Sequence, residues 1–410
     1  MKKILNFALY DFANSAFTTI IITFIFATYF AKQIAPNPIL GQSYWGWTLG
    51  VTGFLVAIIG PIIGSFADKK NKIIFFIRLF TLICIFFTAL LWFSKPSASY
   101  LLYTLIIVGI ANLFYELSLI FYNSLLKNIS TKKNMGRLSG FGFAFGYIGG
   151  IVILLISIKL FIDNNNLPFG LVKEEFQNIR AIAIIVSVWF LIFSTPLLFF
   201  VLKEKKTKIK KKITSNFEDI KKLIWNKKIS DLGKFLIARM LYADGLNAII
   251  VMGGIFAVGV FNLEIKDLLK LSIIMNISAF IGALIGGFAN DKYGSKIVII
   301  ISLIGLILSS LTILFTFSVS KFFLLAAING LFIGPIQSAS RVVITSMVDK
   351  YDQGKGFGLF ATSGKLTSFL GPLLVSTVTF FTNSQRLGFS AAIILLLGGL
   401  IIFLNIKKIN

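Results

Sequence analysis

The stretch GSFADKKNK at positions 64–72 is a short charged break between two long apolar runs. A second stretch, GFANDKYGSK at positions 287–296, has the same character and also separates two apolar runs. In each copy a glycine stands four residues before an Asp-Lys pair, and these residues are Gly64, Asp68 and Lys69, then Gly287, Asp291 and Lys292. One such loop means little, but two copies indicate a chain built from two related halves.

The composition places the chain in a membrane. Its 410 residues are 57% hydrophobic and only 14% charged, and the mean hydropathy is +0.89. An ordinary soluble globule is therefore excluded, and we expect a polytopic membrane protein with the lipid bilayer as a partner. The formal charge of +24 does not indicate nucleic-acid binding, because Lys and Arg are concentrated in short segments between apolar runs.

The residue types also limit the chemistry. The sequence contains no histidine and a single cysteine, Cys84, so the usual zinc, haem and His-dependent catalytic sites and any intrachain disulfide are excluded. Gly358, Gly364 and Lys365 resemble a phosphate loop, but the spacing is one residue too long and no Ser or Thr follows the lysine. We expect no enzyme, no metal and no cofactor. A membrane-embedded enzyme is the least supported alternative.

A spanning helix needs about 20 mostly apolar residues, and twelve runs meet that requirement: 4–31, 44–66, 73–94, 99–126, 138–161, 180–202, 233–260, 268–289, 297–317, 321–346, 356–381 and 387–406. The first run resembles a signal peptide, but polar residues interrupt it and no clear cleavage site follows, so we expect a retained helix.

The predicted organisation is an N-terminal six-helix half (1–202), a basic linker (203–232) and a C-terminal six-helix half (233–410). We therefore expect an all-α polytopic membrane protein with twelve transmembrane helices in two pseudo-symmetric halves, which is the architecture of secondary transporters of the major facilitator type.

The basic residues set the orientation. Most of them fall in loops on one side, including Lys2, Lys3, Lys70, Lys72, Lys127, Arg137, Lys350, Lys355, Lys407 and the run 203–212. We therefore expect this side, with both termini, to be cytoplasmic. In the linker, Ile213, Phe217, Ile220 and Ile224 recur at helical spacing after a Ser215-Glu218 capping box. This pattern fits either an amphipathic helix on the inner leaflet or a solvated linker.

A carboxylate within the membrane also occurs once in each predicted half, like the charged loops. Asp11 and Asn14 follow a Leu-Tyr pair in the first run, and Asp244 and Asn247 follow one in the seventh. Each Asp lies roughly 12 to 15 Å inside its helix at 1.5 Å per residue. Because a buried carboxylate is costly in a bilayer, we expect these residues, with Ser15, to face a polar cavity that binds substrate or a proton. The alternative is a structural ion pair with Arg239 or Lys365.

The fourth run carries a second polar stripe, formed by Asn112, Glu116, Tyr122 and Asn123. Glu116 falls near mid-membrane, where it is a proton-coupling group, a counter-charge for a cationic substrate or a partner for a basic residue. Lys365 falls about nine residues inside the eleventh run and is the strongest cationic candidate.

The duplicated loops predict a conformational latch. Gly64 and Gly287 allow close approach of a neighbouring backbone, and Asp68 and Asp291 can accept hydrogen bonds from a helix N-terminus or pair with an arginine. Arg341 is either part of this latch or a snorkelling residue, and Lys69 and Lys292 stay at the surface. The alternative is a pair of solvated turns.

Several blocks resemble the vacuole-effluxer-like family of the major facilitator superfamily along nearly the whole chain. The similar stretches are LYDFANSAF at 9–17, FYNS at 121–124, RLSGFG at 137–142, GYIGG at 146–150, DG at 244–245, QSASR at 337–341, GK with SFLGP at 364–372, and SQRLG at 384–388. The pair of loops around Asp68 and Asp291 is the more general motif of the superfamily.

The resemblance implies alternating-access transport of a small polar solute. Some eukaryotic members of the family are vacuolar amino-acid exporters, so amino acids are the leading expectation. If transport is coupled to protons, Glu116, Asp11 or Asp244 would carry the proton. We expect a monomer in the plasma (inner) membrane of a prokaryote. A lipid or lysolipid flippase on the same scaffold is the alternative, and it would require a largely apolar cavity open to the bilayer.

Overall fold

The computed structural model describes residues 2–164, 166–201, 221, 223–226, 228–263 and 265–407. Most of the predicted interfacial helix of the linker, including Ile213, Phe217 and the Ser215-Glu218 capping box, lies outside these residues. Just before the seventh span, β1 (Trp225–Asn226) and β2 (Lys228–Ile229) form a two-stranded antiparallel ribbon.

Within the described residues, twelve helical segments are long and apolar enough to cross a membrane, which confirms the predicted fold class. Helices are favoured there because a spanning segment has to satisfy its backbone hydrogen bonds internally. The α-helices are α1 (Lys2–Ala16), α2 (Ile25–Tyr29), α3 (Pro38–Lys70), α4 (Ile73–Leu90), α5 (Leu101–Ser124), α6 (Leu126–Ile129), α7 (Met135–Ser157), α8 (Gln177–Thr195), α10 (Asp231–Phe261), α11 (Ile265–Tyr293), α12 (Ser295–Phe315), α13 (Val319–Met347), α14 (Gln353–Lys365), α15 (Leu370–Thr382) and α16 (Gln385–Leu404).

The chain packs into two compact units. Unit 1 comprises Met1–Ile58, Lys70–Tyr122 and Phe145–Lys208, and unit 2 comprises Ile59–Lys69, Asn123–Ala144 and Ile209–Asn410. Two short pieces of the N-terminal sequence, the end of α3 and the start of α7, therefore pack with the C-terminal helices.

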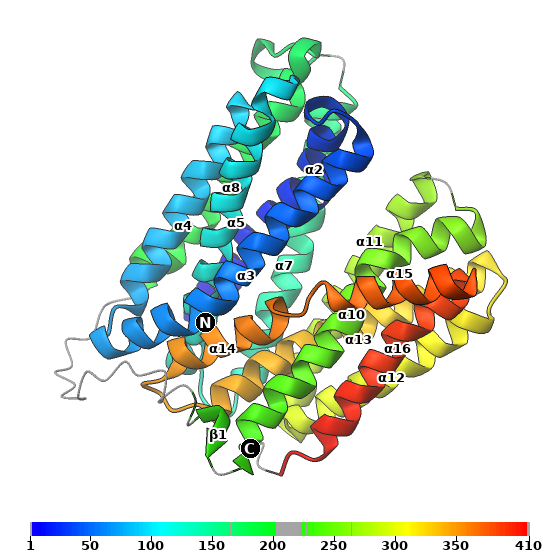
Figure 1. Cartoon of the computed structure of the whole chain (residues 1–410). Helices are drawn as coiled ribbons and strands as arrows, with labels where there is room; N and C mark the ends of the chain where they lie inside the picture. The colour runs from blue at the N-terminus through cyan, green and yellow to red at the C-terminus, as the bar shows by residue number, and fades with distance from the viewer. Residues whose placement is uncertain are drawn as a thin grey trace. The chain divides into compact units, whose positions relative to one another are not determined.

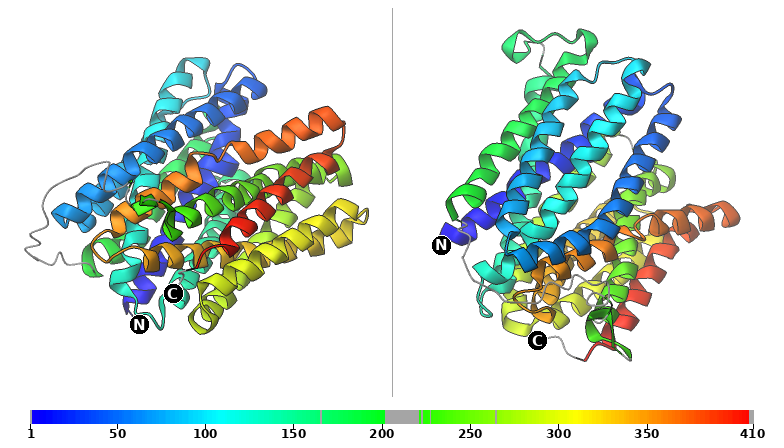
Figure 2. Two further views of the ribbon diagram at one scale, coloured as in Figure 1. Left: turned by 60° about the horizontal axis from the view of Figure 1, so that its bottom comes forward. Right: turned by 60° about the vertical axis from the view of Figure 1, so that its left-hand side comes forward.

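In unit 1, α3, α4, α5 and α8 run side by side (Figures 1 and 2). The Tyr10 hydroxyl on α1 lies 2.6 Å from the Thr81 hydroxyl on α4 and donates to Ser118 Oγ on α5 at 3.2 Å. In unit 2, the Tyr242 hydroxyl on α10 lies 2.7 Å from Ser340 Oγ on α13. The tyrosine of each Leu-Tyr pair is thus anchored to a serine on the fourth helix of its own half.

Arginines cap helix ends in the same repeated way. In unit 1, Arg180 at the start of α8 donates from Nε to Trp92 O, just after α4, and its guanidinium lies 4.8 Å from the Trp92 ring. In unit 2, Arg386 at the start of α16 donates to Leu314 O at 2.5 Å and to Thr316 O at 2.7 Å, at the end of α12. Both arginines satisfy carbonyl groups that a helix end leaves without intrahelical partners.

The eleventh span departs from the prediction of one continuous helix over 356–381. The structure divides it into α14 and α15, with non-helical residues 366–369 between them and a visible change of direction (Figure 1). Pro372 has no N–H to donate to Ser368 O, four residues earlier, and that carbonyl instead accepts a 2.7 Å hydrogen bond from Asn247 Nδ2 on α10. Proline alone does not break a spanning helix, because Pro61 and Pro335 lie inside the continuous helices α3 and α13.

Candidate substrate and gating sites

The Asp11 carboxylate lies in a fully built hydrogen-bond network in unit 1. Asp11 as a whole residue is only 7% exposed. Oδ2 accepts a 2.8 Å hydrogen bond from the Tyr122 hydroxyl, and Oδ1 accepts one of 3.3 Å from Asn14 Nδ2. The Tyr115 hydroxyl donates to Asn14 Oδ1 at 3.3 Å. We call Asp11, Asn14, Tyr115 and Tyr122 the helix-one network.

Aromatic packing holds this network in place. The Tyr122 ring is stacked between Phe7 and Tyr10, with centroid distances of 4.3 and 4.5 Å. Gly149 on α7 allows α1 to approach closely, because a Cβ at this glycine would collide with Phe12 O and lie 2.7 Å from Ser15 Oγ. Ser15 therefore serves the contact between α1 and α7, and its hydroxyl donates to Phe12 O.

The other predicted residues of the fourth span are not all part of this network. Asn112 is buried and donates a 2.7 Å hydrogen bond to Thr52 Oγ1 on α3. Glu116 is half-buried. Asn123, the first residue of its segment in unit 2, has a buried Oδ1 without a hydrogen-bond partner.

Asp244 on α10 has very different surroundings in unit 2. It is only 2% exposed, and its Oδ1 is buried without a hydrogen-bond partner. Thr367, in the break between α14 and α15, lies close enough to this carboxylate to interact with it, but its hydroxyl makes no hydrogen bond of normal geometry. Next to them, a Cβ at Gly371 would collide with Asp244 O, so the start of α15 lies directly against α10.

Asp244 does not form an ion pair with Arg239, which was one predicted alternative for this carboxylate. The Arg239 guanidinium donates from Nη1 to Phe360 O at 2.5 Å and to Ser363 Oγ at 2.7 Å, and it lies 3.4 Å from the centre of the Phe360 ring. Lys365 is the last residue of α14. We call Arg239, Asp244, Asn247, Thr367 and Ser368 the helix-break site.

Asp68, at the end of α3, contacts the N-terminus of α14. Its Oδ1 accepts a 2.9 Å hydrogen bond from Gly354 N, and its Oδ2 accepts one of 2.8 Å from Lys355 N. The side chain is 8% exposed. A Cβ at Gly64 would collide with the Gly354 carbonyl, so the glycine permits this approach. The carboxylate thus satisfies two N–H groups at the positive end of a helix.

Asp291, near the end of α11, makes the matching contact with the N-terminus of α7. Oδ1 accepts from Gly136 N at 2.6 Å, and Oδ2 accepts from Arg137 N at 3.2 Å and from Arg137 Nε at 2.7 Å. Gly287 packs against this turn, since a Cβ there would lie 3.0 Å from Gly136 O. Lys292 is exposed and lies over the Tyr293 ring. Lys69 is half-buried.

Further contacts of α6 and α7 with α13 and the residue that follows it reinforce this end of unit 2. Ser139 donates to Ser338 O at 2.8 Å, and Lys127 donates to Val348 O. Arg341 is only 4% exposed and its guanidinium lies 4.1 Å from the Phe143 ring. Arg341 is therefore buried in protein and does not snorkel to the surface.

The sequence indicated the two carboxylates, Asp11 and Asp244, but not the side chains that lie next to them. It placed Tyr122 on a polar stripe of another helix but did not connect it with Asp11. Thr367 was not singled out at all. Its signal was the adjacent Gly371-Pro372 pair, which marks a weak point in an apolar helix.

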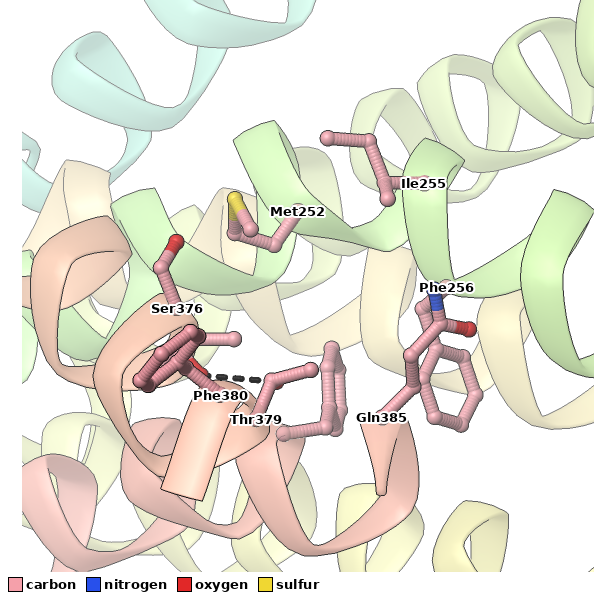
Figure 3. A pocket seen from close by; sticks show the side chains of 9 residues that line it. Met252, Ile255, Phe256, Ser376, Thr379, Phe380 and Gln385 are labelled. Carbon is pink, nitrogen blue, oxygen red and sulfur yellow. Dashed lines mark hydrogen bonds between the residues drawn. The ribbon is translucent and has the colours of Figure 1, made fainter. Parts of the chain in front are cut away.

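Unit 2 also contains an apolar cavity of about 290 Å³ between α10, α15 and α16 (Figure 3). Met252 and Phe256 of α10 face Ser376, Thr379 and Phe380 of α15 across it, and the lining also includes Ile255, Val375, Gln385 and Phe389. The Thr379 hydroxyl is already bonded to Val375 O. The cavity is therefore mostly apolar and distinct in character from the helix-break site.

Comparisons with known proteins agree on the class. An uncharacterised MFS-type transporter, YxiO of Bacillus subtilis, is 25% identical over 406 residues, which cover 97% of this chain and 93% of YxiO. Autophagy-related protein 22 of Yarrowia lipolytica is 25% identical over 303 residues, covering 66% of this chain and 50% of that protein. The crystal structure of the MFS transporter FucP in the outward conformation superposes with a TM-score of 0.77 at 13% identity, covering 100% and 99% of the two chains.

The sequence profile of the family described as vacuole effluxer Atg22 like matches residues 32–408, which is most of the chain. The family and the structural neighbours are transporters, not enzymes, and the twelve spans make the protein an integral membrane protein. The chain therefore belongs to the vacuole-effluxer Atg22-like family of major facilitator transporters.

Proposed function

We propose that this protein moves a small polar solute, with amino acids as the leading candidates, across the plasma (inner) membrane of a prokaryote by alternating access. The family supports a transporter of small solutes. The polar solute is inferred from the two buried intramembrane carboxylate sites, one in each unit. An ionisable side chain at such depth is costly and is a functional-site candidate by default.

The observation that carries the proposal is the pair of Asp contacts with helix N-termini. Asp68 binds the start of α14, and Asp291 binds the start of α7. In each case a glycine lets two helix backbones come close together, so few side chains pack between them. Such contacts suit a latch that forms in one state and breaks in another, and both aspartates belong to the basic loops that we assign to the cytoplasmic side.

The amino-acid assignment rests on two arguments. Autophagy-related protein 22 relatives belong to the same family, and the family resemblance implies amino-acid export for some eukaryotic members. In unit 2, the helix-break site provides the Asp244 carboxylate for an ammonium group, and the same unit carries basic side chains at Arg239 and Lys365 for a carboxylate. A zwitterion would match this distribution of charge.

A binding and transport experiment tests the proposal. The purified chain is screened by thermal unfolding against the twenty amino acids and a set of sugars and organic acids, and each hit is then assayed for uptake into proteoliposomes with and without a pH gradient. We expect saturable stabilisation by one or more amino acids and counterflow of the same compounds. An absence of both for every polar solute would refute the proposal.

The apolar cavity of Figure 3 keeps a lipid or lysolipid flippase as the second candidate. Ile255 and Phe380 line this cavity and are largely exposed, as expected for a surface that meets acyl chains. A fluorescent-lipid scrambling assay in the same proteoliposomes distinguishes the candidates. Lipid translocation without amino-acid counterflow would favour the flippase.

A further inference from the structure

The helix-break site contains two buried oxygens that have no hydrogen bond of normal geometry. These are Oδ1 of Asp244, a residue only 2% exposed, and Oγ1 of Thr367, whose hydroxyl lies close enough to the carboxylate to interact with it. A buried carboxylate oxygen without a partner is costly, and few such groups persist in native proteins without a ligand, water or ion. These two oxygens are therefore candidate ligands for a bound group.

The basic side chains of this region, Arg239 and Lys365, do not bind Asp244 Oδ1. Arg239 and Asp244 are five residues apart on α10, which places them about 140° apart around the helix at 100° per residue. Arg239 is committed to Phe360 O, Ser363 Oγ and the Phe360 ring. Within the described part of the chain, no ion pair joins it to Asp244. Lys365 already interacts with another group, which is not Asp244 Oδ1.

The broken helix adds a third kind of oxygen. α14 ends at Lys365, and its last regular hydrogen bond runs from Leu366 N to Thr362 O. The carbonyl groups after Thr362 in the last turn have no intrahelical donors, and together they carry a partial negative charge. Lys365 O accepts a 3.2 Å hydrogen bond from Ser368 Oγ, and Ser368 O, further along the break, accepts one from Asn247 Nδ2.

The donor set determines the class of ligand. A carboxylate, a hydroxyl and backbone carbonyls are all hard oxygen ligands, and half-helix C-termini with unwound carbonyls are used to coordinate Na⁺ in other transporters. A single carboxylate supplies one negative charge. No group of three or more Asp, Glu, His or Cys side chains comes together in the described residues, so a divalent cation is not favoured.

We propose that the helix-break site binds a small monovalent cation, with the Asp244 carboxylate, the Thr367 hydroxyl and the last-turn carbonyls of α14 as its ligands. The cation is either an alkali ion such as Na⁺ or the ammonium group of an amino acid. Only the second source rests on the proposed function. Binding would tie the α14–α15 break to α10, so the occupancy of the site would stabilise this geometry of the eleventh span.

Thermal unfolding of the full chain tests this inference. The unfolding temperature is measured at constant ionic strength while choline chloride is replaced by NaCl, LiCl or KCl. In parallel, glycine is compared with N-acetylglycine, which has no ammonium group. We expect one alkali ion, or glycine but not N-acetylglycine, to raise the unfolding temperature saturably by several degrees. Asp244→Asn and Thr367→Ala should remove this shift.

Two matched variants control for charge and for hydroxyl loss. Asp267→Asn removes a carboxylate from the start of α11, where it pairs with Lys270, and Thr377→Ala removes an exposed hydroxyl from α15. Both should retain the full shift. The inference is overturned if no cation stabilises the native chain, or if the shift survives in both Asp244→Asn and Thr367→Ala. Na⁺ binding without any amino-acid transport would instead refute only the proposed solute.

Discussion

Asp11 and Asp244 occupy the same repeated motif but have opposite surroundings. Asp11 accepts hydrogen bonds from Tyr122 and Asn14, whereas Asp244 Oδ1 has no partner. Asp11 directly follows Tyr10, but Asp244 comes two residues after Tyr242. One extra residue turns a side chain by about 100° around a helix. The repeat thus preserves the anchoring tyrosine and redirects the carboxylate, so a duplicated motif does not guarantee a duplicated site.

The helices packed against the two aspartates also differ, because one is continuous and the other is broken. In unit 1, α7 continues unbroken past Gly146 and Gly149, which contact α1 near Asp11 and Phe12. In unit 2, the corresponding eleventh span breaks just before Gly371. The Asp11 carboxylate in unit 1 therefore has its hydrogen bonds satisfied, whereas unit 2 has incompletely bonded oxygens beside a break in a helix. We infer that the second site carries the ligand chemistry and the first is mainly structural.

Transport should separate the two aspartates most strongly. Asp244→Asn should reduce uptake of the identified substrate on the order of 100-fold, because loss of a charged interaction of about 2 to 3 kcal/mol corresponds to that factor. Asp11→Asn should reduce it less, on the order of tenfold or below. Initial rates in proteoliposomes, normalised to inserted protein, measure both. A greater loss in Asp11→Asn would reverse the comparison.

The two glycine contacts offer a second comparison. A Cβ at Gly64 would collide with the Gly354 carbonyl, whereas a Cβ at Gly287 comes no closer than 3.0 Å to its neighbours. Gly64→Ala should therefore lower uptake about tenfold, corresponding to about 1.4 kcal/mol, and Gly287→Ala should lower it less. Gly254→Ala is the matched control, because a Cβ there meets nothing within 4 Å. Equal effects of all three would argue against a tight latch.

Stability should distinguish the satisfied aspartate from the unsatisfied one. Tyr122→Phe removes the hydroxyl that binds Asp11 and should lower the free energy of unfolding by about 1 to 2 kcal/mol. Asp244→Asn should leave the unfolding temperature unchanged or raise it in the absence of ligand, because it removes a buried charge with an unpartnered oxygen. A double-mutant cycle with Asp11→Asn tests the coupling to Tyr122. Additive losses would show that the hydrogen bond contributes nothing.

The smallest effect is expected at the two capping arginines. Arg386 donates to three carbonyl groups around the end of α12, whereas Arg180 donates to one carbonyl at the end of the third span and one near its own helix start. Arg386→Gln should cost about 1 kcal/mol and Arg180→Gln somewhat less. Thermal unfolding of both variants, compared with the native chain, measures the difference. A larger loss of stability for Arg180→Gln would show that the number of carbonyl groups bound does not determine the contribution of these arginines.

The candidate site was only partly predictable. The sequence indicated Asp11, Asn14, Asp244 and Asn247, because polar residues are conspicuous in apolar runs. It did not indicate Thr367 as a neighbour of Asp244, or Arg180 and Arg386 as helix caps. Their roles depend on helices that are distant in the chain, and spacing within one helix carries no information about such neighbours.

By itself, the sequence determined the twelve apolar spans and the polar residues within them, and it predicts two repeated halves. Hydrophobic length, loop charge and duplicated motifs are properties of short segments, and the bilayer constrains each segment separately. Only the tertiary structure decided which carboxylate is satisfied, where the eleventh span breaks and which helix N-termini the loop aspartates bind. Those outcomes depend on the rotation of each helix about its axis and on the backbone groups of its neighbours, and neither is encoded in a local pattern.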